Sequence, residues 1–129
     1  MTRHESRELA FILLFEQTFT GEPVKEILKS AGEARDVAAD EFALSLAAGV
    51  EAHVEEVDAL IAEASHRWSK DRLSRVALCV MRLAVYEMRY LEDIPVSVSI
   101  NEAVELTKTY GGDEEPSFVN GVLGGIARQ

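Results

Sequence analysis

The sequence predicts an all-α fold: a compact bundle of six to seven helices in a single domain that spans residues 1–129. Apolar residues recur at intervals of three and four through most of the chain, which is the period of an amphipathic helix. Residues typical of helix starts and helix ends separate these stretches, and the gaps between them are short. One segment, residues 96–100, alternates like a strand, but the chain offers no second segment to pair with it.

The first helix is expected to begin near Arg3. Thr2 and Glu5 have the spacing of a capping box, in which each side chain accepts a hydrogen bond from a backbone N–H at the helix start. Residues 9–15 are all apolar, so we expect this helix to run through the centre of the fold. Gly21 is expected to end it.

Two more helices follow in the first half of the chain. Pro23 suits the first turn of a short second helix. From residue 42 to residue 68 apolar residues step by three or four, which predicts the longest helix of the chain. Its other face is acidic, because residues 33–63 hold nine acids and one base. Gly49 would either bend this helix or let another backbone approach closely.

The next predicted helix starts with Ser69 as its cap and continues to Asp93, because the apolar residues again follow the helical period. Pro95 is expected to prevent it from continuing.

The last two helices are defined by their starts and stops. Ser99 and Glu102 have capping-box spacing, so residues 96–99 are interpreted as an extended lead-in to a helix from about residue 100 to residue 110. The glycine pair at residues 111–112 is expected to close that helix. Pro116 then suits the first turn of a last short helix.

Composition excludes several classes of protein. The formal charge is −10 and the pI is about 4.7, which opposes indiscriminate binding to nucleic acid or to an anionic membrane. No apolar run approaches the roughly 18 to 20 residues that cross a bilayer, and the N-terminal residues do not resemble a secretory signal, so a cytoplasmic protein is expected. The single cysteine, Cys79, excludes an intramolecular disulfide and is interpreted as a small core residue.

No motif for catalysis is evident, so we expect no enzyme, no cofactor and no metal. The three histidines, His4, His53 and His66, never have the two-histidine helical spacing that holds zinc. The glycine pairs follow no strand and precede no Lys-Ser or Lys-Thr step, so they form no phosphate loop. The carboxylates of residues 51–63 are interpreted as a solvated helix face.

Basic residues are distributed unevenly. Residues 64–91 carry six bases and two acids, a local charge of +4. At the N-terminus, Arg3, His4 and Arg7 share the first two turns of the first helix, where the helix dipole also favours phosphate. This spot could bind RNA, although Glu5 and Glu8 dilute it; the alternative, solvated arginines paired with nearby acids, stays open.

Three blocks in the second half of the chain are more specific. They read Val-Met-Arg-Leu-Ala-Val-Tyr-Glu-Met at residues 80–88, Ile-Asn-Glu-Ala-Val-Glu-Leu at residues 100–106, and Phe-Val-Asn-Gly-Val-Leu at residues 118–123. Together they resemble the NusB family of bacterial transcription antitermination factors over essentially the whole chain. The resemblance implies two packed helical subdomains and no catalysed reaction. It also implies pairing with the ribosomal protein NusE, binding to boxA RNA of ribosomal leader transcripts, and indirect engagement of other Nus factors and RNA polymerase.

The resemblance also implies which residues act. The RNA-binding residues would be Arg3, His4, Arg7, Phe15 and Phe118. The residues facing NusE would be Asp71, Arg72 and Arg75. Because the basic cluster is sparse, we expect weak RNA binding without the partner.

Alternatives to these roles remain. The main alternative function is a helical protein–protein scaffold or homodimer without RNA binding, in which the acidic third helix docks basic partners. Within the resembling blocks, Arg82 and Glu87 could instead form a structural ion pair. The pair Asn120 and Gly121 could serve close packing.

Overall fold

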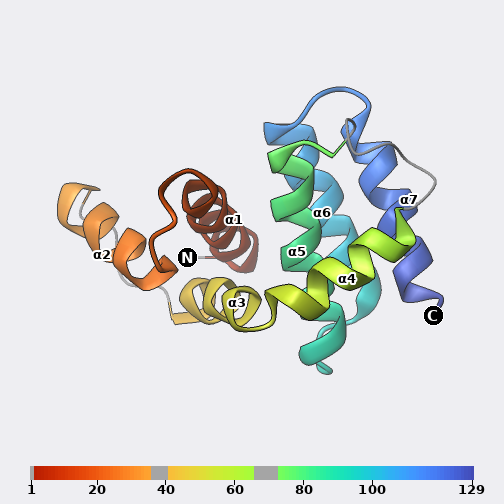
Figure 1. Cartoon of the computed structure of the whole chain (residues 1–129), viewed down its shortest axis with the longest axis horizontal. Helices are drawn as coiled ribbons and strands as arrows, with labels where there is room; N and C mark the ends of the chain where they lie inside the picture. The colour runs from red at the N-terminus through yellow and green to blue at the C-terminus, as the bar shows by residue number, and fades with distance from the viewer. Residues whose placement is uncertain (1, 36–40, 66–72) are drawn as a thin grey trace.

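The computed structural model describes residues 2–35, 41–65 and 73–129, which form helices and no strand (Figure 1). The helices are α1 (Arg3–Thr20), α2 (Val24–Arg35), α3 (Glu41–Ala52), α4 (Val54–Ala64), α5 (Arg75–Tyr90), α6 (Val96–Tyr110) and α7 (Glu115–Ala127). The all-α prediction is confirmed for this part of the chain. The predictions for His66, Ser69, Asp71 and Arg72 lie outside the described residues.

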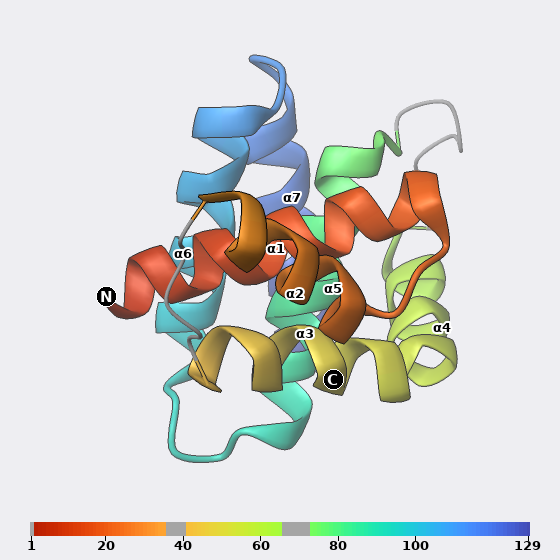
Figure 2. The same cartoon turned by 90° about the vertical axis from the view of Figure 1, so that its left-hand side faces the viewer.

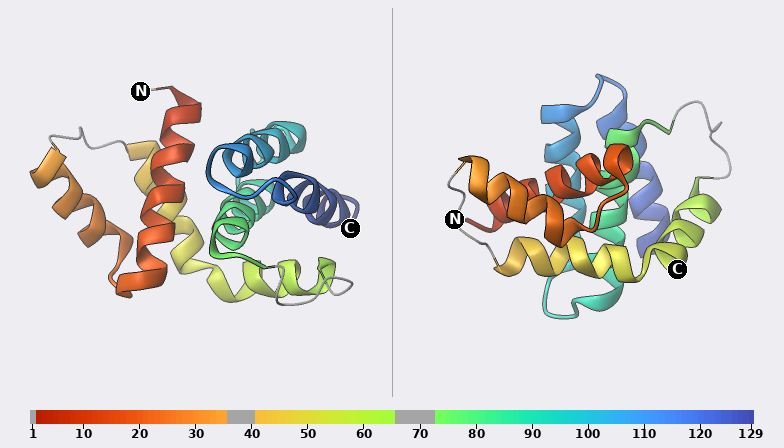
Figure 3. Two further views of the ribbon diagram at one scale, coloured as in Figure 1. Left: turned by 90° about the horizontal axis from the view of Figure 1, so that it is seen from above. Right: turned by 60° about the vertical axis from the view of Figure 1, so that its left-hand side comes forward.

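The helices pack as two groups. Helices α1, α2 and α3 contact one another, and α4, α5, α6 and α7 form the second group (Figures 1 and 3). Both α1 and α3 also pack on α5, and Figure 2 shows α1 crossing in front of α5 and α6. Two packed helical subdomains are therefore confirmed, with α5 as the helix that both share.

Helix α1 has the predicted boundaries. The Thr2 hydroxyl accepts from the Glu5 backbone N–H and the Glu5 carboxylate accepts from the Thr2 N–H, both at 3.1 Å, which completes the capping box. Gly21 takes a left-handed conformation with φ of 71° and donates to the Gln17 carbonyl at 2.9 Å. The middle of the helix is buried, as its continuous apolar run predicts, and α2 begins directly after Pro23.

The predicted long helix from residue 42 to residue 68 is wrong, because the chain turns at His53 and forms α3 and α4 instead. The apolar residues keep their spacing across this turn because both helices bury them in the same core. Val50 of α3 and Val57 of α4 are examples. Gly49 plays neither predicted role. A Cβ at Gly49 would overlap the ring of Tyr86, so this glycine admits an aromatic side chain from α5.

Helix α5 starts at Ser74, whose hydroxyl accepts from the Ala77 backbone N–H at 3.0 Å. It ends at Tyr90, three residues before the predicted end at Asp93, and a short loop carries the chain to Pro95.

The interpretation of residues 96–99 as an extended lead-in is also wrong. Helix α6 already begins at Val96, with Pro95 as its N-cap residue. Ser99 is therefore not a cap. It is buried within the helix and its hydroxyl donates to the Glu87 carboxylate at 3.0 Å.

The C-terminal helices end and begin as expected. Gly111 follows the last residue of α6, and Pro116 lies in the first turn of α7. The alternative that Asn120 and Gly121 serve close packing is wrong. Both residues are exposed, and a Cβ at Gly121 would meet nothing within 4 Å. The buried face of α7 carries Phe118, Val119, Val122, Leu123 and Ile126.

Cys79 lies in the core, where burial raises the pKa of its thiol to about 11. It is therefore a packing residue rather than a nucleophile. None of the described helices has both the length and the apolar content needed to traverse a bilayer.

Candidate nucleic-acid and partner surfaces

The N-terminal turn of α1 presents two exposed basic side chains, Arg3 and His4. The guanidinium carbon of Arg3 lies 3.7 Å from the centre of the Phe42 ring on α3, which positions an otherwise flexible side chain. At the same turn, the hydrogen bonds with Thr2 lower the pKa of the Glu5 carboxylate. A carboxylate that stays charged here offsets part of the positive potential of the two basic side chains.

Arg7 is not part of this exposed surface. Only 5% of the residue is accessible, and its guanidinium forms an ion pair with the Glu87 carboxylate of α5 at 2.9 Å. The sequence placed Arg3, His4 and Arg7 in one basic spot, but of these three residues only Arg3 and His4 are exposed. Arg3 and Arg7 share a side of the helix, as their spacing predicts, but α5 covers the second turn.

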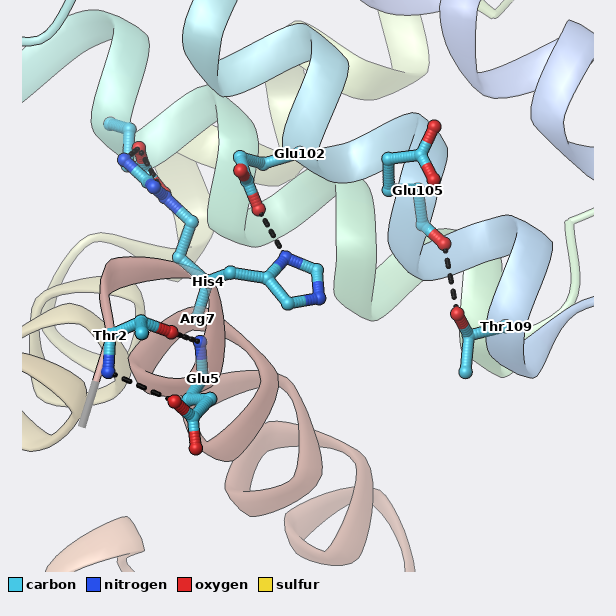
Figure 4. Close-up of polar contacts among 8 residues, drawn as sticks. Thr2, His4, Glu5, Arg7, Glu102, Glu105 and Thr109 are labelled. Atoms are coloured by element: carbon cyan, nitrogen blue, oxygen red, sulfur yellow. Dashed lines mark hydrogen bonds and ion pairs between the residues drawn. The ribbon is translucent and has the colours of Figure 1, made fainter.

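The imidazole of His4 contacts α6. Its Nδ1 lies 2.7 Å from Oε2 of Glu102 (Figure 4). The hydrogen bond to Glu102 raises the pKa of His4, and the nearby carboxylates of Glu8 and Glu105 raise it further. The exposed turn of α1 therefore has two basic side chains, Arg3 and His4. Four acids lie near them: Glu5, Glu8, Glu102 and Glu105.

Phe15 belongs to an aromatic row along α1. Its ring centre lies 5.8 Å from that of Phe11 and 5.2 Å from that of Phe19. Phe11 in turn lies 4.9 Å from Tyr110, at the end of α6. Phe15 is half-buried, so part of its ring is accessible for stacking.

Phe118 is 7% exposed, so its ring is core rather than a surface platform. It lies beneath a hollow of about 300 Å³ that is also lined by Gly112, Asp113, Glu114 and Glu115. The charged residues of the described lining are all acids, and these would repel phosphate.

Arg75, predicted to face a partner, lies at the exposed start of α5. Its guanidinium carbon is 4.3 Å from the centre of the Phe19 ring, and Phe19 is 62% exposed. The sequence reasoning missed Phe19, although its spacing of four from Phe15 places it on the same helix face. Asp71 and Arg72 precede Arg75 in the chain but lie outside the described residues.

The predicted pairing of Arg82 with Glu87 is wrong. Arg82 forms a two-point ion pair with Asp58 of α4, with both N···O distances at 2.8 Å, whereas Glu87 is occupied by Arg7 and Ser99. Residues five apart point to different sides of a helix, which explains why each finds another partner.

Within the described ranges, no group of three or more histidine, cysteine, aspartate or glutamate residues is positioned to hold a metal ion.

Comparison with known proteins gives a consistent result. The model of the NusB family matches residues 4–128. The transcription antitermination protein NusB of Myxococcus xanthus is 43% identical over 131 residues, covering 97% of this chain and 94% of the relative.

Solved structures show the same similarity. NusB of T. maritima is 37% identical, with a TM-score of 0.88 over all of this chain and 92% of the other. A crystal structure of the antitermination factors NusB and NusE in complex with double-stranded RNA contains a chain that is 30% identical, with a TM-score of 0.84 over 99% of this chain and 98% of the other.

Proposed function

Because the chain belongs to the NusB family, we propose that it is a transcription antitermination factor, an RNA-binding adaptor that pairs with NusE. As a single domain of residues 1–129, it would bind boxA in nascent ribosomal RNA leaders and make RNA polymerase processive, engaging the polymerase and other Nus factors indirectly. One observation carries this proposal: the chain matches, over nearly its whole length, a protein crystallised with NusE and RNA. The role requires no catalysis and belongs in the cytoplasm, where bacterial transcription takes place.

The proposed RNA surface begins at the exposed turn of α1. Arg3 and His4 would contact phosphates beside the N–H groups of the helix start, and Phe15 would stack on a base. Arg7 would support this surface from below, because it is buried against Glu87 of α5. Phe118, the other residue predicted to bind RNA, lies in α7, which packs on α4, α5 and α6 and not on α1, so it would not support this turn.

The proposed NusE surface lies at the other end of α1. Phe19 and Arg75 form an exposed aromatic and cationic pair, and residues of these types commonly dominate protein interfaces. Asp71 and Arg72 would extend it along the chain.

RNA binding is proposed to require this partner. Two basic groups among four carboxylates neutralise few phosphates, so the chain alone should have low affinity and a shallow salt dependence. A bound partner would add cationic groups and extend the surface.

A mobility shift with boxA RNA tests the proposal. We expect the chain alone to shift the RNA weakly, and the chain with its cognate NusE to shift it strongly and in preference to a scrambled sequence. Absence of an RNA-containing complex with NusE present would refute the adaptor function.

The second candidate is a protein–protein scaffold or homodimer without RNA binding. The burial of Arg7 against Glu87 favours it, because that leaves fewer exposed cations than the sequence suggested. A scaffold would bind NusE in the same experiment but retain no RNA, and light scattering would reveal a homodimer.

A further inference from the structure

Three aromatic rings gather where α3 turns into α4 and meets the end of α5. The ring centres of His53 and Tyr90 are 4.2 Å apart, and those of Tyr86 and Tyr90 are 5.3 Å apart, with the planes tilted by 22° and 26°. Tyr90 is 36% exposed, whereas Tyr86 is wedged over Gly49. The cluster therefore presents an aromatic surface that the fold holds in place.

Carboxylates border this cluster. Two shallow hollows, of about 500 and 430 Å³, share Glu56 and Tyr90 as lining residues. The charged residues in their described linings, His53 aside, are Glu51, Glu55, Glu56, Glu63 and Arg89. Among the described lining residues four acids stand against one base, so the part of the groove that they form is negative.

Two of these carboxylates, Glu51 and Glu56, are held in position. The Tyr90 hydroxyl donates to Glu56, and Oε2 of Glu51 accepts from the Gln17 amide and from the Val24 backbone N–H. The one arginine is drawn toward the C-terminus, where its Nη2 lies 3.3 Å from Oε1 of Gln129. The guanidinium of a bound arginine would therefore meet two carboxylates whose positions are fixed, those of Glu51 and Glu56.

The Tyr90 side of this groove is distant from Arg75, whereas Glu51 on its other side contacts Gln17, two residues before Phe19. Tyr90 ends α5 and Arg75 begins it, so the helix places them roughly 22 Å apart along its axis. The acids also exclude RNA as the occupant, because phosphate would be repelled.

We propose that this acidic, aromatic groove binds an arginine-bearing segment of a basic protein other than NusE. A planar guanidinium suits both features, because it stacks on an exposed tyrosine ring while donating to carboxylates at its edge. The inference goes beyond the RNA and NusE functions and does not depend on them.

A titration of the isotope-labelled chain, followed by NMR, tests this proposal. The probe is a short peptide of alternating arginine and glycine, compared with a peptide in which neutral citrulline replaces arginine. We expect amide shifts concentrated at His53, Glu56 and Tyr90 with the arginine peptide only. Equal binding of the citrulline peptide, or shifts spread over every acidic helix, would overturn the proposal.

Variants separate the groove from the general negative charge. The double change Glu55→Gln with Glu56→Gln, and separately Tyr90→Leu, should each weaken the arginine peptide by about fivefold. Glu26→Gln with Glu41→Gln removes the same charge from α2 and α3 and should change affinity by less than about twofold. Equal effects of the two double variants would refute the groove.

Tyr90→Phe is the control for folding, because it keeps the ring. Since it removes only the hydroxyl that donates to Glu56, it should weaken the arginine peptide by less than Tyr90→Leu does. NusE and boxA binding should be unchanged in Tyr90→Leu. A loss of NusE affinity in that variant would place the groove within the NusE interface and contradict the assignment to another protein.

Discussion

Arg7 of α1 and Glu87 of α5, 80 positions apart in the chain, form a buried two-point ion pair between the subdomains. The side chains are 6% and 2% exposed, and the hydroxyl of Ser99 donates to the same carboxylate. All three side chains are satisfied, which fixes the position of α1 on α5 and α6. The pair therefore determines where the exposed turn with Arg3 lies.

Arg7→Ala should lower the free energy of unfolding by about 3–5 kcal/mol, because it leaves the Glu87 carboxylate buried without its cation. Urea denaturation measures this. Arg82→Ala is the matched control, since it breaks a pair with Asp58 whose side chains are 22% and 40% exposed and should cost no more than about 1 kcal/mol. Equal losses of unfolding free energy in the two variants would show that the buried Arg7–Glu87 pair stabilises the fold no more than the more exposed Arg82–Asp58 pair.

Much of the fold could be predicted from local signals. The capping box at Thr2, the stop at Gly21 and the apolar faces of the helices depend on neighbours within one or two turns. The errors fall where a distant residue decides. Ser99 has the spacing of a cap but donates to Glu87, and the continuous apolar pattern through residues 42–68 gave no sign of the turn at His53.

The site was harder to predict for the same reason. Spacing of four places Arg3 and Arg7 on one side of α1, but only the fold shows that α5 covers Arg7 and leaves Arg3 accessible. Phe19 was not predicted as a site residue, because no signal within α1 shows that the buried part of the helix ends before residue 19.

Arg3→Ala should weaken binding of boxA RNA to the complex with NusE without changing stability. If Arg3 contacts one phosphate of a single strand, the slope of log affinity against log salt should fall by about 0.7. Binding measured over a salt series gives this slope. Lys29→Ala removes an exposed charge from α2 and should leave the slope unchanged; identical slopes for both variants would remove Arg3 from the RNA surface.

The His4–Glu102 contact should make stability depend on pH. Because Glu102 raises the pKa of His4 in the folded chain, the contact stabilises fully below the unfolded pKa and is lost as the pH rises through the folded value. His4→Gln should therefore reduce the melting temperature under mildly acidic conditions and have little effect under alkaline ones. In Glu102→Gln, an NMR titration should show the His4 pKa lowered; an unchanged pKa would contradict the contact.

Gly49→Ala should destabilise the fold by about 1–3 kcal/mol, because the added methyl group overlaps the Tyr86 ring. In a Tyr86→Ala background the same change should cost much less, and a double-mutant cycle by thermal unfolding measures the difference. Gly121→Ala is the control: it meets no neighbour and should stabilise α7 by about 0.5–1 kcal/mol. A Gly49→Ala penalty that persists without the ring would point to the backbone instead.

Phe19→Ala should separate partner binding from folding. Its ring is 62% exposed, so truncation should change the free energy of unfolding by no more than about 0.5 kcal/mol. If Phe19 is a central contact for NusE, the same truncation should cost about 2 kcal/mol of binding, or roughly 30-fold in Kd. Calorimetric titration with NusE measures it.

Arg75→Ala in the Phe19→Ala background should then add less than it does alone, because the guanidinium stacks on that ring. Val96→Ala, at an exposed apolar position at the start of α6, is the control and should bind NusE normally. Arg75 and Phe19 come from different subdomains, and the fold brings them together. Full additivity of the two effects on binding would mean that NusE contacts each residue independently and not as a pair.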